Sequence, residues 1–324
     1  MSIQPRAILA ALSCDRAVSG STLATQLGVT RAAVWKQIEA LRALGAPIEA
    51  AAGRGYRLQW PVELLDAKAI RRELDSPLRA RTTDLHVHWQ IDSTNSELLR
   101  QASQGVAELS VCIAETQSAG RGRRGRAWQS QLGGNIYFSL LRRFARGMGA
   151  LSGLSLVAGV ALMQALGDCG VTGIGLKWPN DVLADGAKLA GILVELGGEF
   201  LGPCFAVIGI GVNLRLPDAP GIDQPCTDLA RLCANKLPSR NRLIARLIAR
   251  LIGALDRFDA EGFAGFRDEY AHFDALIGHT VSVCTGAGEV FGIADGVDAR
   301  GALRVRQDRK LTTFDSAEVS VRRA

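Results

Sequence analysis

Four arginines alternate with glycines in one short segment near the middle of the chain, which we call the arginine loop (residues 119–126). The arginines are Arg121, Arg123, Arg124 and Arg126, and the glycines are Gly120, Gly122 and Gly125. Glycine lets a backbone turn freely and approach a ligand closely. The planar guanidinium group of arginine donates paired hydrogen bonds to carboxylate and phosphate oxygens. The segment therefore predicts a site that holds more than one anion.

The composition of this loop alone also fits a solvated surface loop or an RNA-binding arginine–glycine tract. The run is short, occurs once, and is followed by an apolar, strand-like segment at residues 135–141. A disordered tract would not lie between two core segments. The context therefore favours a folded, ligand-binding loop.

Two further segments carry polar groups that could meet a ligand. Lys177 begins the sequence Lys-Trp-Pro-Asn-Asp in an apolar neighbourhood, where a lysine is costly unless an anion meets it. The alternative is a surface lysine whose stem lies along apolar groups. Residues 92–95, Asp-Ser-Thr-Asn, are typical of a helix N-terminus. They could also present neutral hydrogen-bonding groups to a polar ligand, although in isolation the capping role is favoured.

The elements that must position these groups follow from hydrophobic periodicity. The pattern predicts a helix after residue 95 and strands at residues 86–91, 110–115, 135–141, 175–183 (strand, turn, strand), 189–195 and 205–214. The charge-free segment 147–167 has the length of a membrane helix. Its serines, glutamine and glycines favour a buried core helix instead. The basic amphipathic segment 241–259 is expected to pack as a surface helix rather than to bind a membrane.

Most of the positive charge surplus lies in the first sixty residues, where seven Lys/Arg face three Asp/Glu. This indicates a polyanionic partner. Helical spacing with a turn at Gly28 predicts a helix-turn-helix, and residues 48–58 predict a hairpin wing. The groups expected to contact DNA are Thr30, Arg31, Lys36, Gln37 and, at the wing tip, Arg54. A protein-binding helical module is the alternative. Trp35 is expected at the edge of the core rather than on DNA.

The tail changes character. After residue 276 short alternating strands are separated by glycine and aspartate turns, one of them at residues 286–288, which predicts a small β-barrel. A linker helix is expected at residues 67–74. The predicted fold class is α+β multidomain: a winged helix-turn-helix at residues 1–62, a central mixed α/β domain at 63–275, and the barrel at 276–324.

Composition bounds the remaining possibilities. The 324 residues are 48% hydrophobic and 22% charged, as in ordinary globular proteins. The seven cysteines are scattered, form no Cys-x-x-Cys, and do not stand at zinc-ligand spacing from a histidine. They predict reduced thiols in a cytoplasmic protein without a structural metal. His86 and His88 are expected on a strand surface. No signal peptide is expected at the N-terminus.

In five motifs taken together, the chain resembles the biotin protein ligases, specifically the bifunctional bacterial kind that also represses biotin synthesis. The motifs, in order, are Asp92-Ser-Thr-Asn95, Gln117-Ser-Ala-Gly-Arg-Gly-Arg-Arg-Gly-Arg126, Lys177-Trp-Pro-Asn-Asp181, Lys188-Leu-Ala-Gly-Ile-Leu-Val-Glu195 and Gly209-Ile-Gly-Val-Asn213. The resemblance extends to the winged helix and to the tail, which it implies is an SH3-like barrel.

The resemblance implies an enzyme that joins biotin to the α-phosphate of Mg-ATP and then passes biotin to a lysine of a biotin carboxyl carrier protein. It implies biotin contacts from Ser93, Thr94, Asn95, Gln117, Gly120, Arg121, Gly122, Arg123 and Lys177. It implies contacts to ATP or its phosphates from Arg123, Arg124, Arg126, Asn180 and Asn213. Lys177, Arg121 and Arg123 are the implied catalytic residues. Mg²⁺ is expected to arrive with ATP, near Asn213, with no metal site of the protein's own.

The resemblance also implies that adenylate-bound chains pair as a homodimer on operator DNA, and it implies no membrane partner. One departure concerns adenine: some relatives cover it with an aromatic side chain, but no Phe, Trp or Tyr occurs between residues 206 and 257. Two alternatives stay open. One is a lipoate ligase, against which the arginine loop and the Lys177 motif argue. The other is a repressor that uses biotin only as an effector.

Overall fold

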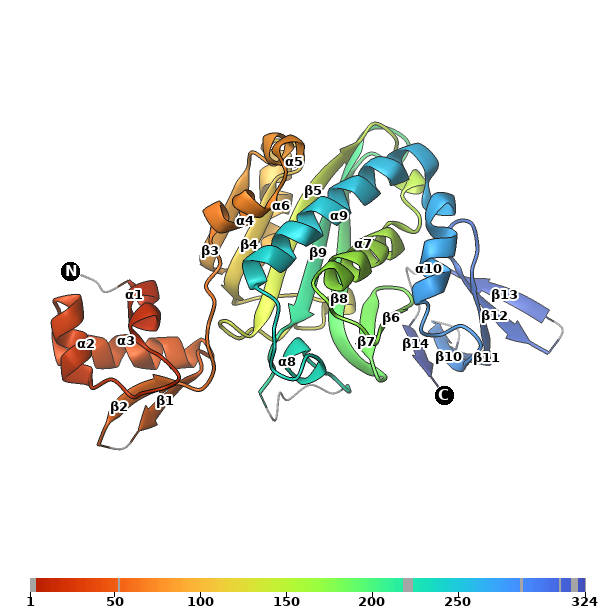
Figure 1. Cartoon of the computed structure of the whole chain (residues 1–324). Coiled ribbons are helices and arrows are strands. Elements are labelled where there is room, and N and C mark those ends of the chain that lie inside the picture. Colours follow the sequence, from red (N-terminus) through yellow and green to blue (C-terminus); the bar gives the residue numbers. More distant parts are fainter. Residues whose placement is uncertain are drawn as a thin grey trace.

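The computed structural model describes residues 4–51, 53–217, 224–285, 288–308, 310–315 and 320–323 (Figure 1). An N-terminal winged helix lies at one end, a large central sheet with its helices in the middle, and a small β-structure at the other end (Figure 1). The predicted α+β multidomain class is confirmed. Among the described residues no helix is long and apolar enough to cross a bilayer.

The winged helix is built from α1 (Pro5–Ala11), α2 (Gly20–Leu27), α3 (Arg31–Ala43), β1 (Ile48–Ala51) and β2 (Gly55–Leu58). Ser19 caps α2 by accepting a hydrogen bond from the Thr22 amide, and Thr30 caps α3 in the same way from Ala33. Gly28 between them has a φ of 64°, a conformation that favours glycine. The predicted helix-turn-helix and hairpin wing are therefore confirmed.

Trp35 corrects one expectation. Its side chain is 59% exposed on α3, and it does not lie at the edge of the core. The buried face of α3 consists of Val34, Ile38 and Leu41. Trp35 therefore lies outside the apolar stripe that the helical spacing of these three residues defines.

The central sheet has the strand order β3-β4-β5-β9-β8-β7-β6. Its strands are β3 (Leu85–Ile91), β4 (Val111–Gln117), β5 (Asn135–Phe144), β6 (Ile174–Lys177), β7 (Asp181–Ala184), β8 (Ala187–Gly198) and β9 (Cys204–Asn213). Only β3 and β4 among these run parallel; the other pairs are antiparallel. The predicted strands are present, and several extend by a few residues.

Helices cover both faces of this sheet. The main core includes side chains from α4 (Ala67–Glu73), α7 (Leu154–Asp168) and α9 (Arg240–Glu261). On the opposite face α6 (Thr94–Ser103) buries Leu98 and Ala102 against Leu141 and Val207. The shorter helices are α5 (Ser76–Arg81), α8 (Leu229–Leu232) and α10 (Arg267–Phe273), with 3-10 turns η1 (Arg123–Gly125), η2 (Met148–Ala150) and η3 (Phe263–Phe266).

Two of these helices correspond to segments that could have been membrane helices. For one segment the sequence favours a buried core helix, and for the other a packed surface helix. The charge-free segment forms α7, which begins at Leu154 and is almost entirely buried. The basic amphipathic segment forms α9, whose apolar stripe is buried in the main core. Both interpretations are confirmed.

A buried ion pair fastens the linker that follows the winged helix. Arg240 at the start of α9 lies 2.8 Å from the carboxylate of Glu115, and their side chains are 5% and 0% exposed. Glu115 also accepts a hydrogen bond from the Leu65 amide at 2.6 Å. Glu63 accepts from the Arg240 amide at 2.6 Å. A buried charge is tolerated when it is paired and hydrogen-bonded, so this pair anchors residues 63–65 against the central domain.

The winged helix also contacts the segment that follows the arginine loop. The Leu132 amide donates to the Leu44 carbonyl at 2.9 Å. The Leu132 side chain is fully buried and belongs to the core of the winged helix together with Ile8 and Leu23. The central domain therefore contributes one fully buried side chain to the core of the winged helix, and Trp89 of β3 packs against the same core.

The tail forms a five-stranded antiparallel sheet with the order β13-β12-β11-β10-β14, which is the expected SH3-like, β-rich module. Its strands are β10 (Thr280–Thr285), β11 (Gly288–Val297), β12 (Leu303–Gln307), β13 (Lys310–Phe314) and β14 (Ser320–Arg323). Residues 286–287 of the predicted turn lie outside the described residues. The core of this module is continuous with the main core, and Trp178 Nε1 donates to the Gly301 carbonyl at 3.0 Å.

Candidate functional site

Three cross-strand rows on the α6 face of the central sheet form the base of the site. By register, the first row contains Lys177, Asp181, Gly191, Gly211 and Tyr137. The second contains Leu193, Gly209 and Ser139, and the third contains Glu195, Val207 and Leu141. Side chains alternate between the two faces of a strand. The residues between the rows, such as Ile192 and Ile210, accordingly lie in the main core on the other face.

The arginine loop folds over the first row. It is closed by backbone hydrogen bonds from the Gly122 amide to the Arg126 carbonyl (2.7 Å) and from the Trp128 amide to the Gly120 carbonyl (2.9 Å). A Cβ atom at Gly211 would come within 2.6 Å of the Trp128 ring, and one at Gly191 within 2.9 Å. The two glycines therefore allow the indole to approach the sheet, and Trp128 holds the loop there.

Two lysines flank Asp181 on this face. Lys188 Nζ lies 2.7 Å from Asp181 Oδ1, and the two side chains are only 18% and 16% exposed. The same ammonium lies 5.5 Å from the centroid of the Trp128 ring, within the range of a cation–π contact. Lys177 stands opposite Asp181 in the β6–β7 pair. By register, the structure places Lys177 in the same row as Asp181, and it adds Lys188, which the sequence analysis did not select as a site residue.

The second row carries a buried cluster of neutral polar side chains. The Thr94 amide donates to Gln117 Oε1 at 2.8 Å. Ser139 Oγ lies 2.7 Å from Thr94 Oγ1 and 2.6 Å from Asn95 Oδ1. Gly209 leaves room for this cluster, because a Cβ atom there would come within 2.2 Å of Asn95 Oδ1. Thr94, Asn95 and Gln117 are therefore brought together as predicted, and Ser139 joins them.

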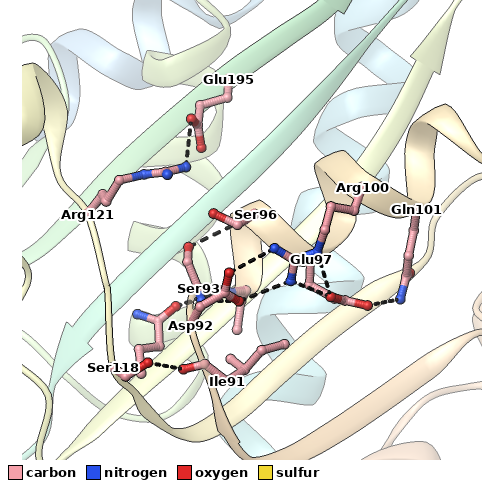
Figure 2. A network of polar contacts seen from close by, with 12 residues as sticks. Ile91, Asp92, Ser93, Ser96, Glu97, Arg100, Gln101, Ser118, Arg121 and Glu195 are labelled. Carbon is pink, nitrogen blue, oxygen red and sulfur yellow. Dashed lines mark hydrogen bonds and ion pairs between the residues drawn. The ribbon is translucent and has the colours of Figure 1, made fainter.

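Glu195 connects this cluster to the arginine loop, and Figure 2 shows its contact with Arg121. Its Oε2 accepts from Asn95 Nδ2 at 2.7 Å. Its Oε1 lies 3.2 Å from Arg121 Nη2. One carboxylate thus bridges the first turn of α6 and the loop, a role that the sequence reasoning did not assign to it.

Ser93 serves as the cap of α6. Its side chain accepts from the Ser96 amide at 3.4 Å, in agreement with the capping interpretation of residues 92–95. Arg100 donates to Asp92 at 2.8 and 3.0 Å (Figure 2). These hydrogen bonds lower the pKa of the Asp92 carboxyl to about 2. The backbone carbonyl of Asp92 also accepts a hydrogen bond from the Ala119 amide, at 2.8 Å. The hydrogen bonds between Arg100 and Asp92 therefore help to fix the start of the arginine loop.

The residues predicted for ATP are less closely gathered. Arg123 Nη1 lies 3.5 Å from Asn180 Oδ1, and burial, followed by the Arg124 charge, lowers the pKa of Arg123. An anion bound beside Arg123 would therefore be stabilised. Arg124 and Arg126 are exposed on the outside of the loop.

Asn213 is buried and its amide is engaged within the protein. Its Nδ2 donates to the carbonyls of Lys188 (3.3 Å) and Thr227 (3.1 Å), and its Oδ1 accepts from Asn135 at 3.1 Å. These bonds hold residue 227 beside β8. The contacts describe an anchor for that segment rather than an open ligand-binding group.

The groups predicted to contact DNA all lie at the surface of the winged helix. Thr30, Arg31, Lys36 and Arg54 are exposed, and Gln37 is partly exposed. None of them lies in the buried stripe of α3. This placement agrees with the sequence-based interpretation of the helix and the wing tip.

Sequence models of three domain families match the chain. Residues 87–213 match the biotin/lipoate A/B protein ligase family, residues 6–57 match an HTH domain, and residues 276–322 match the biotin protein ligase C terminal domain.

Known proteins are similar to nearly the whole chain or to about 70% of it. Proteins named bifunctional ligase/repressor BirA, from Salmonella typhimurium and Escherichia coli, are each 38% identical to the chain, covering 99% of it and 98% of their own length. A biotin–[acetyl-CoA-carboxylase] ligase from Paracoccus denitrificans is 39% identical over 70% of the chain and 96% of its own. The solved structure of an Aquifex aeolicus biotin protein ligase with biotin and ATP has a TM-score of 0.63 and 27% identity, covering 74% of this chain and 99% of that one.

Proposed function

The chain belongs to the biotin protein ligases of the biotin/lipoate A/B protein ligase family, and from this premise we propose that it activates biotin with ATP and transfers it to a lysine of a biotin carboxyl carrier protein. The single observation that carries the proposal is the arrangement on the α6 face of the sheet. There a buried neutral polar cluster lies beside a loop of guanidinium groups and two lysines.

The first reaction joins two anions. A carboxylate oxygen of biotin attacks the α-phosphorus of ATP, and the bond from that phosphorus to the bridging oxygen of pyrophosphate breaks. The step needs positive charge and positioning more than a strong base. Arg121, Arg123, Lys177 and Lys188 supply positive charge on one face. In the second reaction the amine of the carrier lysine attacks the acyl carbon, and AMP leaves.

The ring of biotin is assigned to the neutral cluster. A ureido group has one acceptor oxygen and two N–H donors, so it requires uncharged partners of both kinds. Thr94, Asn95, Gln117 and Ser139 offer hydroxyl and amide groups within one buried network. Ser93 stands beside them at the helix cap.

Mg²⁺ enters with ATP, where the phosphates supply most of its ligands. It neutralises phosphate charge when bound. Asn213, which the resemblance implies lies near the metal, is buried, and three of the four hydrogen-bonding positions of its amide are used by Asn135, Lys188 and Thr227. Asp181 is a carboxylate on the same face as the two lysines, and it suits the neighbourhood of a phosphate-bound cation.

The winged helix gives the chain a second function as a biotin-responsive repressor. The exposed groups Arg31, Lys36 and Arg54 fit DNA phosphates and groove edges. Operator DNA is therefore the proposed partner of residues 4–58. This assignment is independent of the chemistry on the central sheet.

We assign pairing of two chains to the outer edge of β8. Strand β7 pairs with β8 only up to Gly191, whereas β9 pairs with it up to Gly198. The amide and the carbonyl of Ile192 still bond Asn180 on that side, at 2.9 Å each, so the stretch 193–198 has one side that no described strand covers. An uncovered strand edge is a template for pairing with another chain, and a two-fold pair would suit a two-fold operator.

One reaction tests the ligase. The chain is incubated with biotin, Mg-ATP and a biotin carrier domain, and the intact mass of the carrier is then measured by mass spectrometry. Addition of one biotinyl group supports the proposal. Modification by lipoate but not by biotin would favour a lipoate ligase. Binding of biotin without release of pyrophosphate would favour a repressor that uses biotin only as effector.

A further inference from the structure

Glu195 is a charged side chain for which the reaction above has no use. It stands in the third row of the site, and the neighbours opposite it across the sheet, Val207 and Leu141, are apolar. Its side chain is 28% exposed. A carboxylate near a site for anionic substrates repels them, so its presence there calls for a separate reason.

The contacts of this carboxylate give that reason. Oε2 accepts from Asn95 Nδ2 at 2.7 Å, and Oε1 lies 3.2 Å from Arg121 Nη2. An ionised carboxylate can only accept hydrogen bonds, so it fixes which end of the Asn95 amide faces it. The Oδ1 end of that amide then meets Ser139 Oγ, at 2.6 Å. The charge of Glu195 thereby sets the direction of the hydrogen bonds in the neutral cluster.

The same charge orients the loop. A guanidinium group has five N–H donors in a fixed fork, and the contact with Glu195 occupies Nη2 alone. The remaining donors of Arg121 are held in one orientation and stay available to a ligand anion. Fixing an Arg fork in advance reduces the entropy that is lost when it binds an anion.

We propose that Glu195 is a positioning residue, whose carboxylate holds Asn95 and Arg121 in one arrangement and so couples binding of the biotin ring to closure of the arginine loop. The inference rests on the proposed ligase function. A ring bound at Asn95 keeps the carboxylate in place, and the carboxylate keeps the guanidinium group of Arg121 in one orientation. Biotin and ATP should then bind cooperatively.

Glu195→Gln is the sharpest test, because glutamine has the same shape but only one acceptor oxygen. It can satisfy Asn95 or Arg121, but not both. Hydrogen bonds to charged groups contribute about 1.5–3 kcal/mol, so we expect the KM for biotin to rise roughly 10- to 100-fold, with kcat reduced much less. Biotin plus ATP should no longer protect the arginine loop from trypsin. Glu73→Gln removes a charge from exposed α4 and serves as the control.

A double-mutant cycle separates positioning from loss of fold. If Glu195 acts in part through Arg121, the loss of biotin binding in the Arg121→Ala/Glu195→Gln variant should be smaller than the sum of the losses in the two single variants. Additive losses, or an unchanged KM and unchanged trypsin protection in Glu195→Gln, would overturn the inference. Pyrophosphate release by the unaltered chain is measured first. Failure there would count against the ligase itself and is thus distinguishable from failure of the Glu195 proposal.

Discussion

Replacement of Lys188 by alanine should slow formation of the adenylate far more than it weakens the fold. Its ammonium lies 2.7 Å from Asp181 and 5.5 Å from the Trp128 ring, in a side chain that is 18% exposed. Loss of one preorganised donor to a developing negative charge costs roughly 10²–10³ in rate, or about 3–4 kcal/mol. The unpaired Asp181 carboxylate adds repulsion of about 3 kcal/mol toward an anion ~5 Å away at an effective dielectric constant of about 20.

The assay is pyrophosphate release with saturating biotin and ATP, with Lys236→Ala, an exposed lysine, as the matched control. Lys177→Ala, which shares the face, is expected to slow the same step by roughly 10²–10³. The Lys188→Ala/Asp181→Asn variant removes the repulsion but should remain at least roughly tenfold slower than Asp181→Asn alone if the ammonium contacts the reacting anions. Equal rates in the double variant and in Asp181→Asn would mean that Lys188 only neutralises Asp181. A near-normal rate in Lys188→Ala would refute the reasoning outright.

Three further outcomes are expected. Lys36→Ala combined with Arg54→Ala should weaken DNA binding and reduce its salt dependence, with a slope change of about 1 for each DNA phosphate that no longer meets a cation; gel shifts over a salt series measure this, and unchanged slopes would favour the protein-binding alternative. Arg240→Ala leaves the fully buried Glu115 carboxylate unpaired. The free energy of unfolding, measured by urea titration, should therefore fall by about 3–5 kcal/mol. A decrease below about 1 kcal/mol would show that the pair does not anchor the linker. Biotin plus ATP should protect residues 119–126 from proteolysis and shift sedimentation toward a dimer, because bound anions offset the mutual repulsion of the four arginines and favour the folded loop. Equal protection and an unchanged monomer–dimer balance would contradict this prediction.

The elements are predictable where local pattern and tertiary packing agree. The caps at Ser19 and Thr30 and the alternation in the tail strand β12 are local signals, and the structure follows them. The prediction for Trp35 is wrong because its aromatic character suggests burial, while Val34, Ile38 and Leu41 already fill the apolar stripe of α3. Short α5 is not predicted, because its six residues begin at Ser76, between the cap Asp75 and Pro77, a pattern that also fits a turn.

The composition of the site is less predictable than its location. The arginine loop and the first turn of α6 are contiguous motifs, so their chemistry can be read along the chain. Glu195 and Ser139 gain their roles only through register, which places them on two strands beneath Asn95. In the sequence, Arg240 looks like another exposed arginine of an amphipathic helix. In the structure its partner is Glu115, which is 125 residues away in sequence and fully buried.

The division of the apolar cores has a consequence for how the chain responds to heat. The tail module shares a continuous core with the central sheet, so these two parts should melt as one cooperative unit. The winged helix has its own core, and this core includes Leu132 of the central domain. Unfolding of the central domain therefore removes a buried leucine from the core of the winged helix. Unfolding of the winged helix, in contrast, removes no buried side chain from the main core. A calorimetric scan should show two endotherms rather than three. The winged helix should unfold at a temperature no higher than that of the central domain.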